Sequence, residues 1–381
     1  MASVEHRRCV VIGAGIMGAS VAARLAEVGQ RVTLLDRDQP GRGTSRWSLA
    51  WLNSNDKAPR PYHDLNHAGL KAWAELAPDL DGTAWYRPAG HVELAATSAE
   101  LEARVHRLTE WNYPARLIDP AEATAIEPAL RLPGNGTTAA AWFPGEGYLL
   151  TEPLIARLVA RAASHGADIR TGGPGRVTAL DTGPGAATKV RTADGTVLAA
   201  DKVVCCAGRW TPELAAVPLI PWDTPGSAAP GLVVRVGPVS PPGPVRLIHT
   251  PEIALRPHPG GLLHLEAPDA AEAVDLHTPE PELARWAREL LRRAQRTVRG
   301  LDDARVVETQ VCVRPLPPDG QSIVGRLPGS NARYVAVTHS GVTLAAHLSR
   351  LIAEDLTTGT PPPGLAPYHP DRFGQHPPPT P

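Results

Sequence analysis

Residues 8–36 constrain the fold of this chain more than any other stretch of it. The run RCVVIG reads as a short buried strand, and GAGIMG follows it with the spacing G-x-G-x-x-G. A helical pattern of small and larger apolar residues then runs up to Gly29, and RVTLLD reads as a second strand that ends at Asp36. Strand, glycine turn, helix, strand and acid in this order predict a βαβ unit that binds a dinucleotide.

Each position of the glycine motif has a physical task. Gly13 makes a tight turn, Gly15 lets the backbone and Ala14 approach a pyrophosphate, and Gly18 lets the helix pack closely on the strand. The pyrophosphate is expected at the positive helix N-terminus. Asp36 can accept hydrogen bonds from a ribose diol, and its charge disfavours NADP, whose 2′-phosphate it would repel. The motif alone leaves FAD, NAD and a glycine-rich turn without a nucleotide open.

Composition narrows the classes of function. With 381 residues the chain is long enough for two domains or lobes. Its 38 basic and 39 acidic residues argue against a nucleic-acid or anionic-membrane surface as the main partner. No window of about 18 apolar residues predicts a membrane span, and the N-terminal run is too short for a secretory signal, so a cytoplasmic protein is expected. The four cysteines fit no zinc spacing or disulfide framework, and no metal site is predicted.

The rest of the chain alternates helix and strand patterns. Helices are expected at 151–166, 281–298 and 342–356, and the residues from about 221 to 281 look strand-like and are interrupted by prolines. The final residues, 374–381, read as a disordered tail. Short strands are expected in five further segments: ADIRT, RVTALD, KVRTA, TVLAA and KVVCCAG.

Four features in chain order resemble the D-amino-acid oxidase family of flavoenzymes, which includes glycine oxidase and monomeric sarcosine oxidase. The first two are GAGIMG with its acid and the GTS loop at 43–45. The third is the strand VVCCAGRW at 203–210. The fourth is the pair VRPLPPDGQSIVG at 313–325 and THSGVTLAAH at 338–347, before the closing PYHPDRF. The resemblance is faint from roughly 86 to 140 and from 212 to 300.

This resemblance implies an α/β fold with two domains. One is a Rossmann-like FAD-binding domain of the GR2 type, built from the discontinuous segments 1–85, 143–218 and 305–381. The other is a substrate domain made of 86–142 and 219–304, with a mixed or antiparallel sheet and flanking helices.

The resemblance also implies an activity. The expected reaction is FAD-dependent oxidation of a C–N bond in an amino acid or N-alkyl amino acid, by hydride transfer to flavin N5 that gives an imine. Molecular oxygen then reoxidises the flavin to give hydrogen peroxide. A dehydrogenase with another electron acceptor and a non-enzymatic flavoprotein or NAD-binding module remain alternatives. The expected partners are a small amine or amino acid and oxygen, while the oligomeric state stays open.

Three residues are implied in catalysis. Arg314 takes the position of an arginine that holds the substrate carboxylate, although a structural ion pair is the alternative. His339 is expected beside the flavin ring. His264 falls near the oxygen-activating lysine of sarcosine oxidase, and a lone histidine on a strand can equally be structural. Ala345 stands where sarcosine oxidase has a carboxylate-binding lysine. The sequence shows no His-Asp pair or pair of carboxylates that would supply a base.

Cys312 lies seven residues before Asp319, the spacing of the cysteine that sarcosine oxidase links to flavin C8α. A covalent flavin and an inert buried thiol both remain open. Trp47, Trp51 and Trp210 can wall the flavin or belong to the core. The remaining residues expected to contact the cofactor are Arg37, Thr44, Ser45, Val177, Ala207, Gly208, Gly341, Val342 and Thr343.

Overall fold

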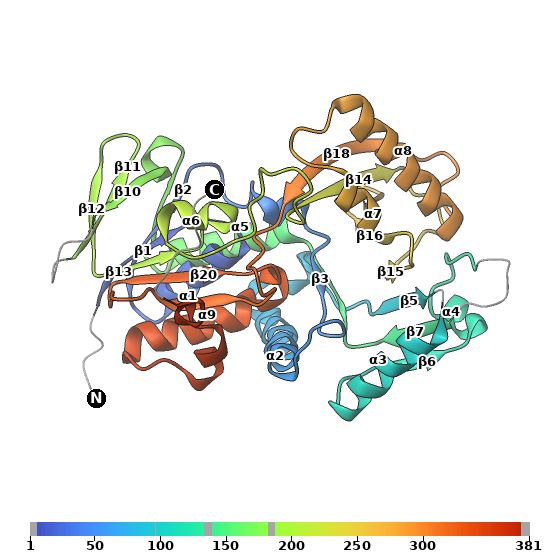
Figure 1. Ribbon diagram of the computed structural model, residues 1–381, viewed down its shortest axis with the longest axis horizontal. Coiled ribbons are helices and arrows are strands. Elements are labelled where there is room, and N and C mark those ends of the chain that lie inside the picture. The colour runs from blue at the N-terminus through green and yellow to red at the C-terminus, as the bar shows by residue number, and fades with distance from the viewer. Residues whose placement is uncertain (1–5, 96, 133–138, 182–186, 375–381) are drawn as a thin grey trace.

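Two sheets in neighbouring lobes organise this chain. The computed structural model describes residues 6–95, 97–132, 139–181 and 187–374. In Figure 1 the lobe on the left contains a six-stranded sheet, and the lobe on the right contains an eight-stranded one. Helices pack on both sheets, so the fold is α/β, as the sequence predicts.

The six-stranded sheet contains the predicted βαβ unit. β1 pairs in parallel with β2 and with β13, and β19 runs antiparallel to β20 at one edge. Val11 and Leu34 are fully buried because both faces of the sheet are covered, which is why these strands read as near-continuous apolar runs. The order is β19-β20-β13-β1-β2-β9, with β1 (Arg8–Ile12), β2 (Arg31–Asp36), β9 (Asp168–Thr171), β13 (Lys202–Cys205), β19 (Ile323–Arg326) and β20 (Arg333–Val337).

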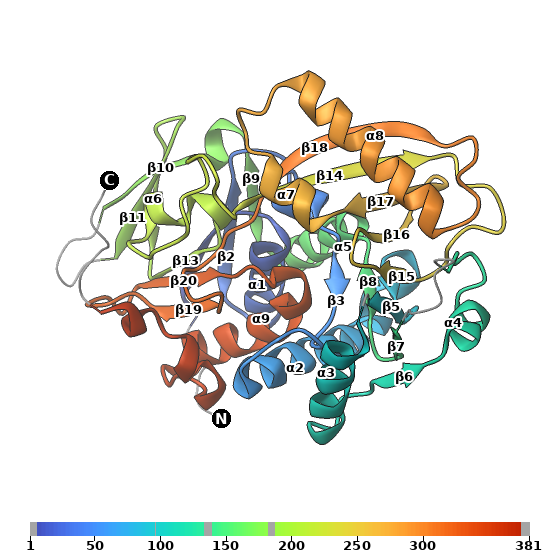
Figure 2. The same cartoon turned by 45° about the vertical axis from the view of Figure 1, so that its right-hand side comes forward.

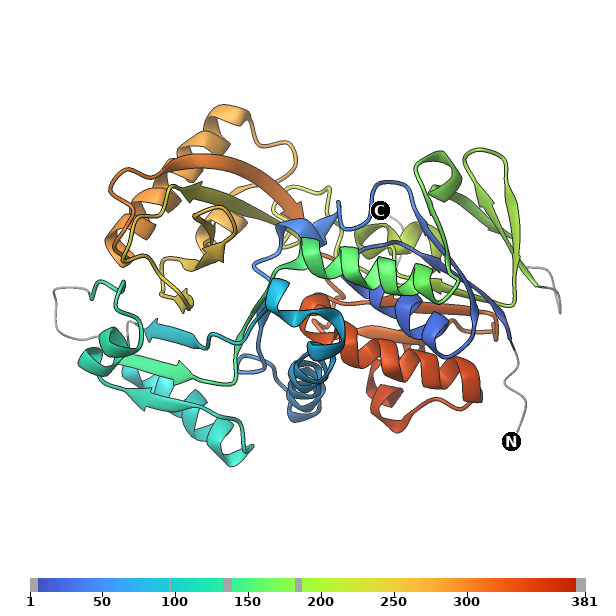
Figure 3. The ribbon, with the colours of Figure 1, turned by 180° about the vertical axis from the view of Figure 1, so that it is seen from behind.

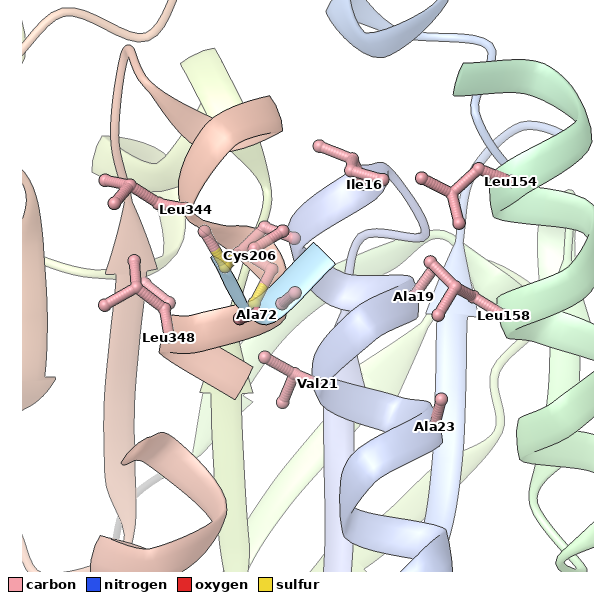
Figure 4. Close-up of a cluster of buried hydrophobic side chains, with 14 of the residues drawn as sticks. Ile16, Ala19, Val21, Ala23, Ala72, Leu154, Leu158, Cys206, Leu344 and Leu348 are labelled. Carbon is pink, nitrogen blue, oxygen red and sulfur yellow. The ribbon is translucent and has the colours of Figure 1, made fainter. Parts of the chain in front are cut away.

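The central helix of this lobe is α1 (Ile16–Glu27). In Figure 4 its Ala19 and Ala23 face α5, while Val21 on the other side faces Leu348 of α9. The small residues let α1 approach both neighbours closely, and the views in Figures 1 and 3 show these helices running alongside one another. The helices that surround α1 are α5 (Thr151–Ser164), α9 (Gly341–Thr358) and, packed on α9, α2 (Arg60–Leu76).

A three-stranded antiparallel sheet extends the nucleotide lobe. Its strands are β10 (Val177–Asp181), β11 (Thr188–Thr192) and β12 (Val197–Ala200). An Asp194-Gly195 turn joins the last two, and Gly195 there has a φ of 87°. This left-handed value suits glycine, which lacks the Cβ that would clash.

The second sheet is mixed. β15 and β5 run parallel, and the other neighbouring strands pair antiparallel. Its order is β18-β14-β17-β16-β15-β5-β7-β6, with β5 (His91–Ala95), β6 (Arg116–Ile118), β7 (Ala139–Phe143), β14 (Pro230–Gly237), β15 (Leu247–His249), β16 (Ala254–His258), β17 (Leu262–Glu266) and β18 (Arg305–Val313).

Helices cover one face of this sheet, and Figure 2 shows α8 lying across it. Leu290 of α8 packs with Leu232 and Val234 of β14 in a buried apolar cluster. The opposite face of β14, β17 and β16 turns toward the nucleotide lobe, and we call this face the platform. The helices are α7 (Pro268–Ala273), α8 (Glu280–Thr297) and α4 (Pro120–Ile126) on the covered face, and α3 (Ser98–Glu110) on the other face at β7.

The chain passes between the lobes more than once. A small sheet of β3 (Trp51–Leu52), β8 (Gly147–Leu149) and β4 (Tyr86–Arg87) joins them. After α6 (Thr211–Leu214) the chain enters the second lobe again and leaves it after β18. The sequence assigned residues from 305 onward to the nucleotide domain, but β18 pairs along its length with β14, so the chain returns to the nucleotide lobe only from Arg314.

No helix in the described part of the chain is long and apolar enough to cross a membrane. Within those same residues no three His, Cys, Asp or Glu side chains gather as a metal site would require. The predicted tail lies outside the described residues except for Gly374.

Candidate cofactor and substrate site

A cavity of about 420 Å³ opens at the carboxyl ends of β1 and β2, where nucleotides bind in open parallel sheets. Residues from the N-terminal motif, β13, β20 and α9 line it together. Figure 1 shows why segments so distant in sequence meet, because β20 and α9 lie beside α1 and β13. The predicted residues among its lining are Gly13, Gly15, Asp36, Arg37, Thr44, Ser45, Val177, Ala207, Gly208, Trp210, His339, Gly341 and Val342.

The glycine turn exposes bare backbone to this cavity. A Cβ on Gly13 would lie 2.4 Å from the carbonyl oxygen of Cys206, and one on Gly18 would lie 1.7 Å from the oxygen of Gly13. α1 begins after Gly15, which has no side chain to cap the first turn, and the N–H of Ile16 donates to Ser45 Oγ at 3.0 Å. Free N–H groups and the positive helix end therefore fit a pyrophosphate.

Asp36, at the end of β2, stabilises the glycine turn by hydrogen bonding to its backbone. Its Oδ2 accepts from the N–H of Ala14 at 2.6 Å, and its Oδ1 accepts from the N–H of Asp38 at 2.8 Å. Burial raises the pKa of this carboxyl above its ordinary value. Ala14 is itself fully buried and does not line the cavity, so it acts through this hydrogen bond.

Asp36→Ala is expected to weaken FAD binding by about 1–3 kcal/mol, because the variant leaves the N–H of Ala14 without its partner and removes an acceptor for the ribose. Flavin fluorescence titration of the apoprotein measures the affinity. Asp38→Ala, which keeps both hydrogen bonds of the Asp36 carboxylate, is the control. An unchanged affinity in Asp36→Ala would remove Asp36 from the binding site.

An arginine that sequence reasoning missed lines the same cavity. The guanidinium of Arg209 lies 4.2 Å from the ring centre of Trp210, and Arg37 lies 3.6 Å from the same ring. Burial and the neighbouring Arg37 lower the pKa of Arg209, whose Nε is buried with no hydrogen-bond partner among the described residues. A buried donor facing a cavity fits an anionic cofactor. The sequence feature that could have identified Arg209 is its position in VVCCAGRW, one of the segments that resemble the flavoenzyme family.

The platform carries a row of polar side chains. Arg235, His264 and Arg256 are paired across β14, β17 and β16. Arg235 donates from Nη2 to the oxygen of Arg46 at 2.9 Å, and Arg256 donates to the oxygens of Ser48 and Leu49. The two buried arginines thus hold the loop whose Thr44, Ser45 and Ser48 line the cavity.

His264 lies within this row and away from the cavity lining. It is fully buried, with Nε2 3.2 Å from Glu266 Oε1. Burial and the cations of Arg256 and Arg235 hold its pKa well below the ordinary value, so the neutral form is expected. Positive charge at this place therefore resides on the two arginines. Trp47 packs beneath Arg235, at 4.5 Å from its guanidinium.

Arg314 follows β18 and reaches across the loop that precedes β14. Its Nη2 donates to the oxygens of Ala228 at 2.5 Å and Pro230 at 3.0 Å, and its Nε to that of Ala229 at 3.3 Å. Nη1 has no hydrogen-bond partner among the described residues. Pro315, not Arg314, lines the cavity.

His339 is the predicted catalytic residue that the cavity does include. Burial, followed by the charges of Lys57 and Arg314, lowers the pKa of His339 to about 3. Arg314 therefore lies within electrostatic range of His339, and the imidazole is neutral near pH 7. A neutral imidazole beside the cavity can orient a substrate by hydrogen bonding.

Cys312 is buried on β18, with its Sγ 4.0 Å from the oxygen of Thr44. Burial and the charge of Glu266 raise the pKa of the thiol to about 12. We expect acid precipitation to release the flavin and leave a colourless pellet, because attack on the flavin requires a thiolate. Mass spectrometry of the peptide that contains Cys312 checks this result. A yellow pellet that Cys312→Ser abolishes would establish the covalent link instead.

Two other residues that the sequence assigned to the cofactor site, Thr343 and Gly18, do not line the cavity and contact only its neighbouring elements. Thr343 donates from Oγ1 to the oxygen of Trp51 at 3.1 Å and does not line the cavity. Gly18 acts through helix packing. Ala345 is fully buried in the core, where a lysine would have no solvent.

A buried group of acid and imidazole side chains lies where the lobes meet, although the sequence showed no such pairing. Trp51 donates from Nε1 to Glu146 Oε2 at 2.8 Å, and His91 Nδ1 lies 3.1 Å from the same oxygen. His91 Nε2 lies 2.9 Å from Nδ1 of His249. These residues are far apart in the chain and stand in ordinary strand and turn contexts, so no local pattern revealed them.

Together the cradle, by which we mean the glycine turn 13–18 with the start of α1, and the platform define a two-lobed dinucleotide-binding protein. A family model described as FAD dependent oxidoreductase (DAO) matches residues 8–355. The chain belongs to this family of FAD-dependent oxidoreductases, and its cofactor is FAD.

Similar proteins extend over nearly the whole chain. Glycine oxidase of Geobacillus kaustophilus is 26% identical over 92% of this chain and 93% of its own length. A D-amino acid dehydrogenase of Methylobacterium nodulans is 29% identical over 93% of this chain and 96% of its own.

Solved structures share the fold. Iminodiacetate oxidase from Chelativorans sp. BNC1 has a TM-score of 0.78 and 23% identity, covering 95% of this chain and 99% of its own. L-proline dehydrogenase from P. horikoshii has a TM-score of 0.79 and 21% identity, covering 97% of this chain and 98% of its own.

Proposed function

We propose that this protein oxidises the C–N bond of an amino acid or N-alkyl amino acid and passes the electrons to molecular oxygen, forming hydrogen peroxide. FAD, held by the glycine turn and the other residues that line the cavity, would supply the redox chemistry, which is hydride acceptance from the α-carbon of the substrate. The protein's residues bind and orient the substrate and exclude water from it.

The observation that carries the proposal is the position of Arg314 between the cavity and the platform. Its Nη1 is free of partners among the described residues, while Nε and Nη2 hold backbone carbonyls and fix the guanidinium in place. A fixed cation with one free donor suits a carboxylate. Relatives named for glycine and for D-amino acids agree with an amino-acid substrate.

A dehydrogenase is the second candidate, because His264 does not provide the cation that the resemblance assigned to oxygen activation. Its pKa is held well below the ordinary value, and it lies away from the cavity lining. Against this, the guanidinium groups of Arg235 and Arg256 flank His264, although that of Arg235 is paired with Glu308 at 2.8 Å. Both reactions share the same reductive half and differ only in the electron acceptor.

A peroxide-coupled screen of D-, L- and N-methyl amino acids tests the proposal. We expect the yellow protein to bleach with at least one of them under anaerobic conditions and to recover its colour in air within the turnover time, with one peroxide formed per imine. Bleaching with slow recovery in air would favour the dehydrogenase. A protein that none of these amines bleaches would contradict both candidates.

A further inference from the structure

Arg209 is a charged residue of the cofactor cavity that its neighbours leave unpaired. It follows β13 in the short turn Gly208–Trp210, is half-buried and lines the cavity. Its guanidinium forms no hydrogen bond and no ion pair with any residue that the structure describes, and its Nε is buried. Arg37, by contrast, lies 3.4 Å from the carboxylate of Asp38. A half-buried cation without a partner costs free energy, which an anion in the cavity would offset.

Two tryptophan rings hold this guanidinium in place. Its Cζ lies 4.2 Å from the ring centre of Trp210 and 4.8 Å from that of Trp222. Trp210 is the next residue in the chain, whereas Trp222 belongs to the connection 215–229, which leads from α6 of the nucleotide lobe to β14 of the second lobe. A cation–π contact requires none of the guanidinium's N–H groups. The two rings therefore restrain Arg209 without using any of its donors.

The charges around Arg209 favour an anionic ligand. Arg37 lies against the same indole, at 3.6 Å from the ring centre of Trp210. Burial, followed by the charge of Arg37, lowers the pKa of Arg209, so its surroundings disfavour its positive charge. Glu213 also lines the cavity and lies within electrostatic range, but it forms no ion pair with Arg209 in the part of the chain that the structure describes. An arginine stays protonated even so, and a ligand anion would relieve the repulsion.

Strand pairing places the turn that carries Arg209 next to the glycine turn. β1 and β13 run in parallel, and the N–H of Cys206 donates to the oxygen of Ile12 at 2.8 Å. The Cβ that Gly13 lacks would lie 3.2 Å from the Cα of Ala207. The two turns thus adjoin each other at the carboxyl ends of paired strands, and both line the cavity. The pyrophosphate, which is the anionic part of FAD, is expected at these strand ends.

We propose that Arg209 binds the pyrophosphate of FAD through its unused N–H groups, and that Trp222 positions it for this contact. The anionic centre of the cofactor would then be bound from two adjoining turns, by backbone N–H groups at the start of α1 and by a guanidinium after β13. The connection that carries Trp222 also holds Arg314, through the carbonyls of Ala228 and Ala229. One segment therefore restrains both arginines. The inference concerns cofactor binding and does not rest on the proposed function.

The affinities of the flavin-free protein for four ligands test the inference. FAD and ADP contain the pyrophosphate, whereas adenosine and riboflavin contain no phosphate. We expect Arg209→Gln to weaken the binding of FAD and ADP by a common factor of about 10- to 150-fold, the range for a hydrogen bond to a charged group. Adenosine and riboflavin should bind to the variant as they do to wild type. Isothermal titration calorimetry measures all four affinities, and no turnover is required.

Arg333→Gln is the matched control. Arg333 of β20 is also half-buried in the nucleotide lobe, and its Nε is buried without a hydrogen-bond partner among the described residues, but it does not line the cavity. Its replacement should leave the affinities for all four ligands at their wild-type values.

Two further variants separate a positioned guanidinium from a charge alone. Arg209→Lys should recover part of the lost affinity for FAD and ADP, because an ammonium keeps the charge but not the planar fork. Trp222→Leu should weaken the binding of the same two ligands by a smaller factor than Arg209→Gln, since Trp210 still contacts the guanidinium. In the double variant Trp222→Leu should cause no further loss, because Trp222 acts only through Arg209.

Unchanged affinities for FAD and ADP in Arg209→Gln would overturn the inference. An equal loss for all four ligands would overturn it too, by showing that Arg209 supports the fold of the lobe. A loss for FAD and riboflavin with wild-type binding of ADP would place Arg209 at the flavin ring instead of the pyrophosphate. The proposed function is tested separately by the amino-acid screen, so a failure of one is distinguishable from a failure of the other.

Discussion

Arg314→Ala is expected to raise the apparent KM for an amino acid by roughly 10- to 150-fold while flavin stays bound. The estimate follows from the about 1.5–3 kcal/mol that a hydrogen bond to a charged group contributes. Arg314→Lys should recover part of the loss, because an ammonium keeps the charge but not the planar fork that holds the carbonyls of Ala228 and Pro230. Steady-state kinetics with a measured flavin-to-protein ratio gives the result.

A substrate analogue without a carboxylate provides the control for Arg314. If Arg314→Ala loses activity equally toward an amine that lacks the carboxylate, the arginine holds the loop before β14 and does not bind substrate. Loss of flavin from the variant would point the same way, because Arg314 lies next to Pro315 of the cavity lining.

Gly18→Ala is expected to abolish FAD binding and to lower the free energy of unfolding by about 3 kcal/mol, the upper range for overpacking. The added Cβ would lie 1.7 Å from the oxygen of Gly13, a backbone atom that cannot turn aside, so α1 would have to move away from β1. The cradle depends on that close approach. Flavin content of the purified protein and thermal denaturation measure both effects.

Gly173→Ala is the matched control, since its Cβ would meet nothing within 4 Å. It should keep full flavin content and an unchanged melting temperature. A Gly18→Ala protein with a full complement of FAD would show that the helix can move without cost to the cradle.

The nucleotide lobe could be predicted because its signals are local. The glycine motif and its acid lie within one βαβ unit, so their spacing in the sequence predicts their arrangement in the fold; they are Gly13, Gly15, Gly18 and Asp36. The family resemblance added the expectation that β20 and α9 return to this lobe. Strand pairing across long separations has no such signal. The register of β18 on β14 joins segments about 75 residues apart, which is why residues 305–313 were assigned to the wrong side of the boundary between the lobes.

The buried group of Glu146, His91 and His249 could not be predicted from the sequence for the same reason. His91 and His249 are 158 residues apart, and they meet only because β5 and β15 pair in parallel. In the sequence, Arg235 and Arg256 likewise look like ordinary strand arginines. Only the structure shows the backbone carbonyls of the loop to which they donate. The role of a buried polar side chain depends on its hydrogen-bond partners, and here those partners lie on strands and loops that are distant in the sequence.

The pairing of β13 with β20, and of α1 with α9, has a consequence for biosynthesis. A ribosome makes the glycine turn long before it makes β20 and α9, so the nascent chain lacks one wall of the FAD cavity until these two elements have been made. The complete cavity can bind the cofactor only after that point, and until then the earlier elements keep apolar surface uncovered. In cells short of riboflavin, the chains that have not yet bound FAD would be the ones most exposed to proteases and chaperones.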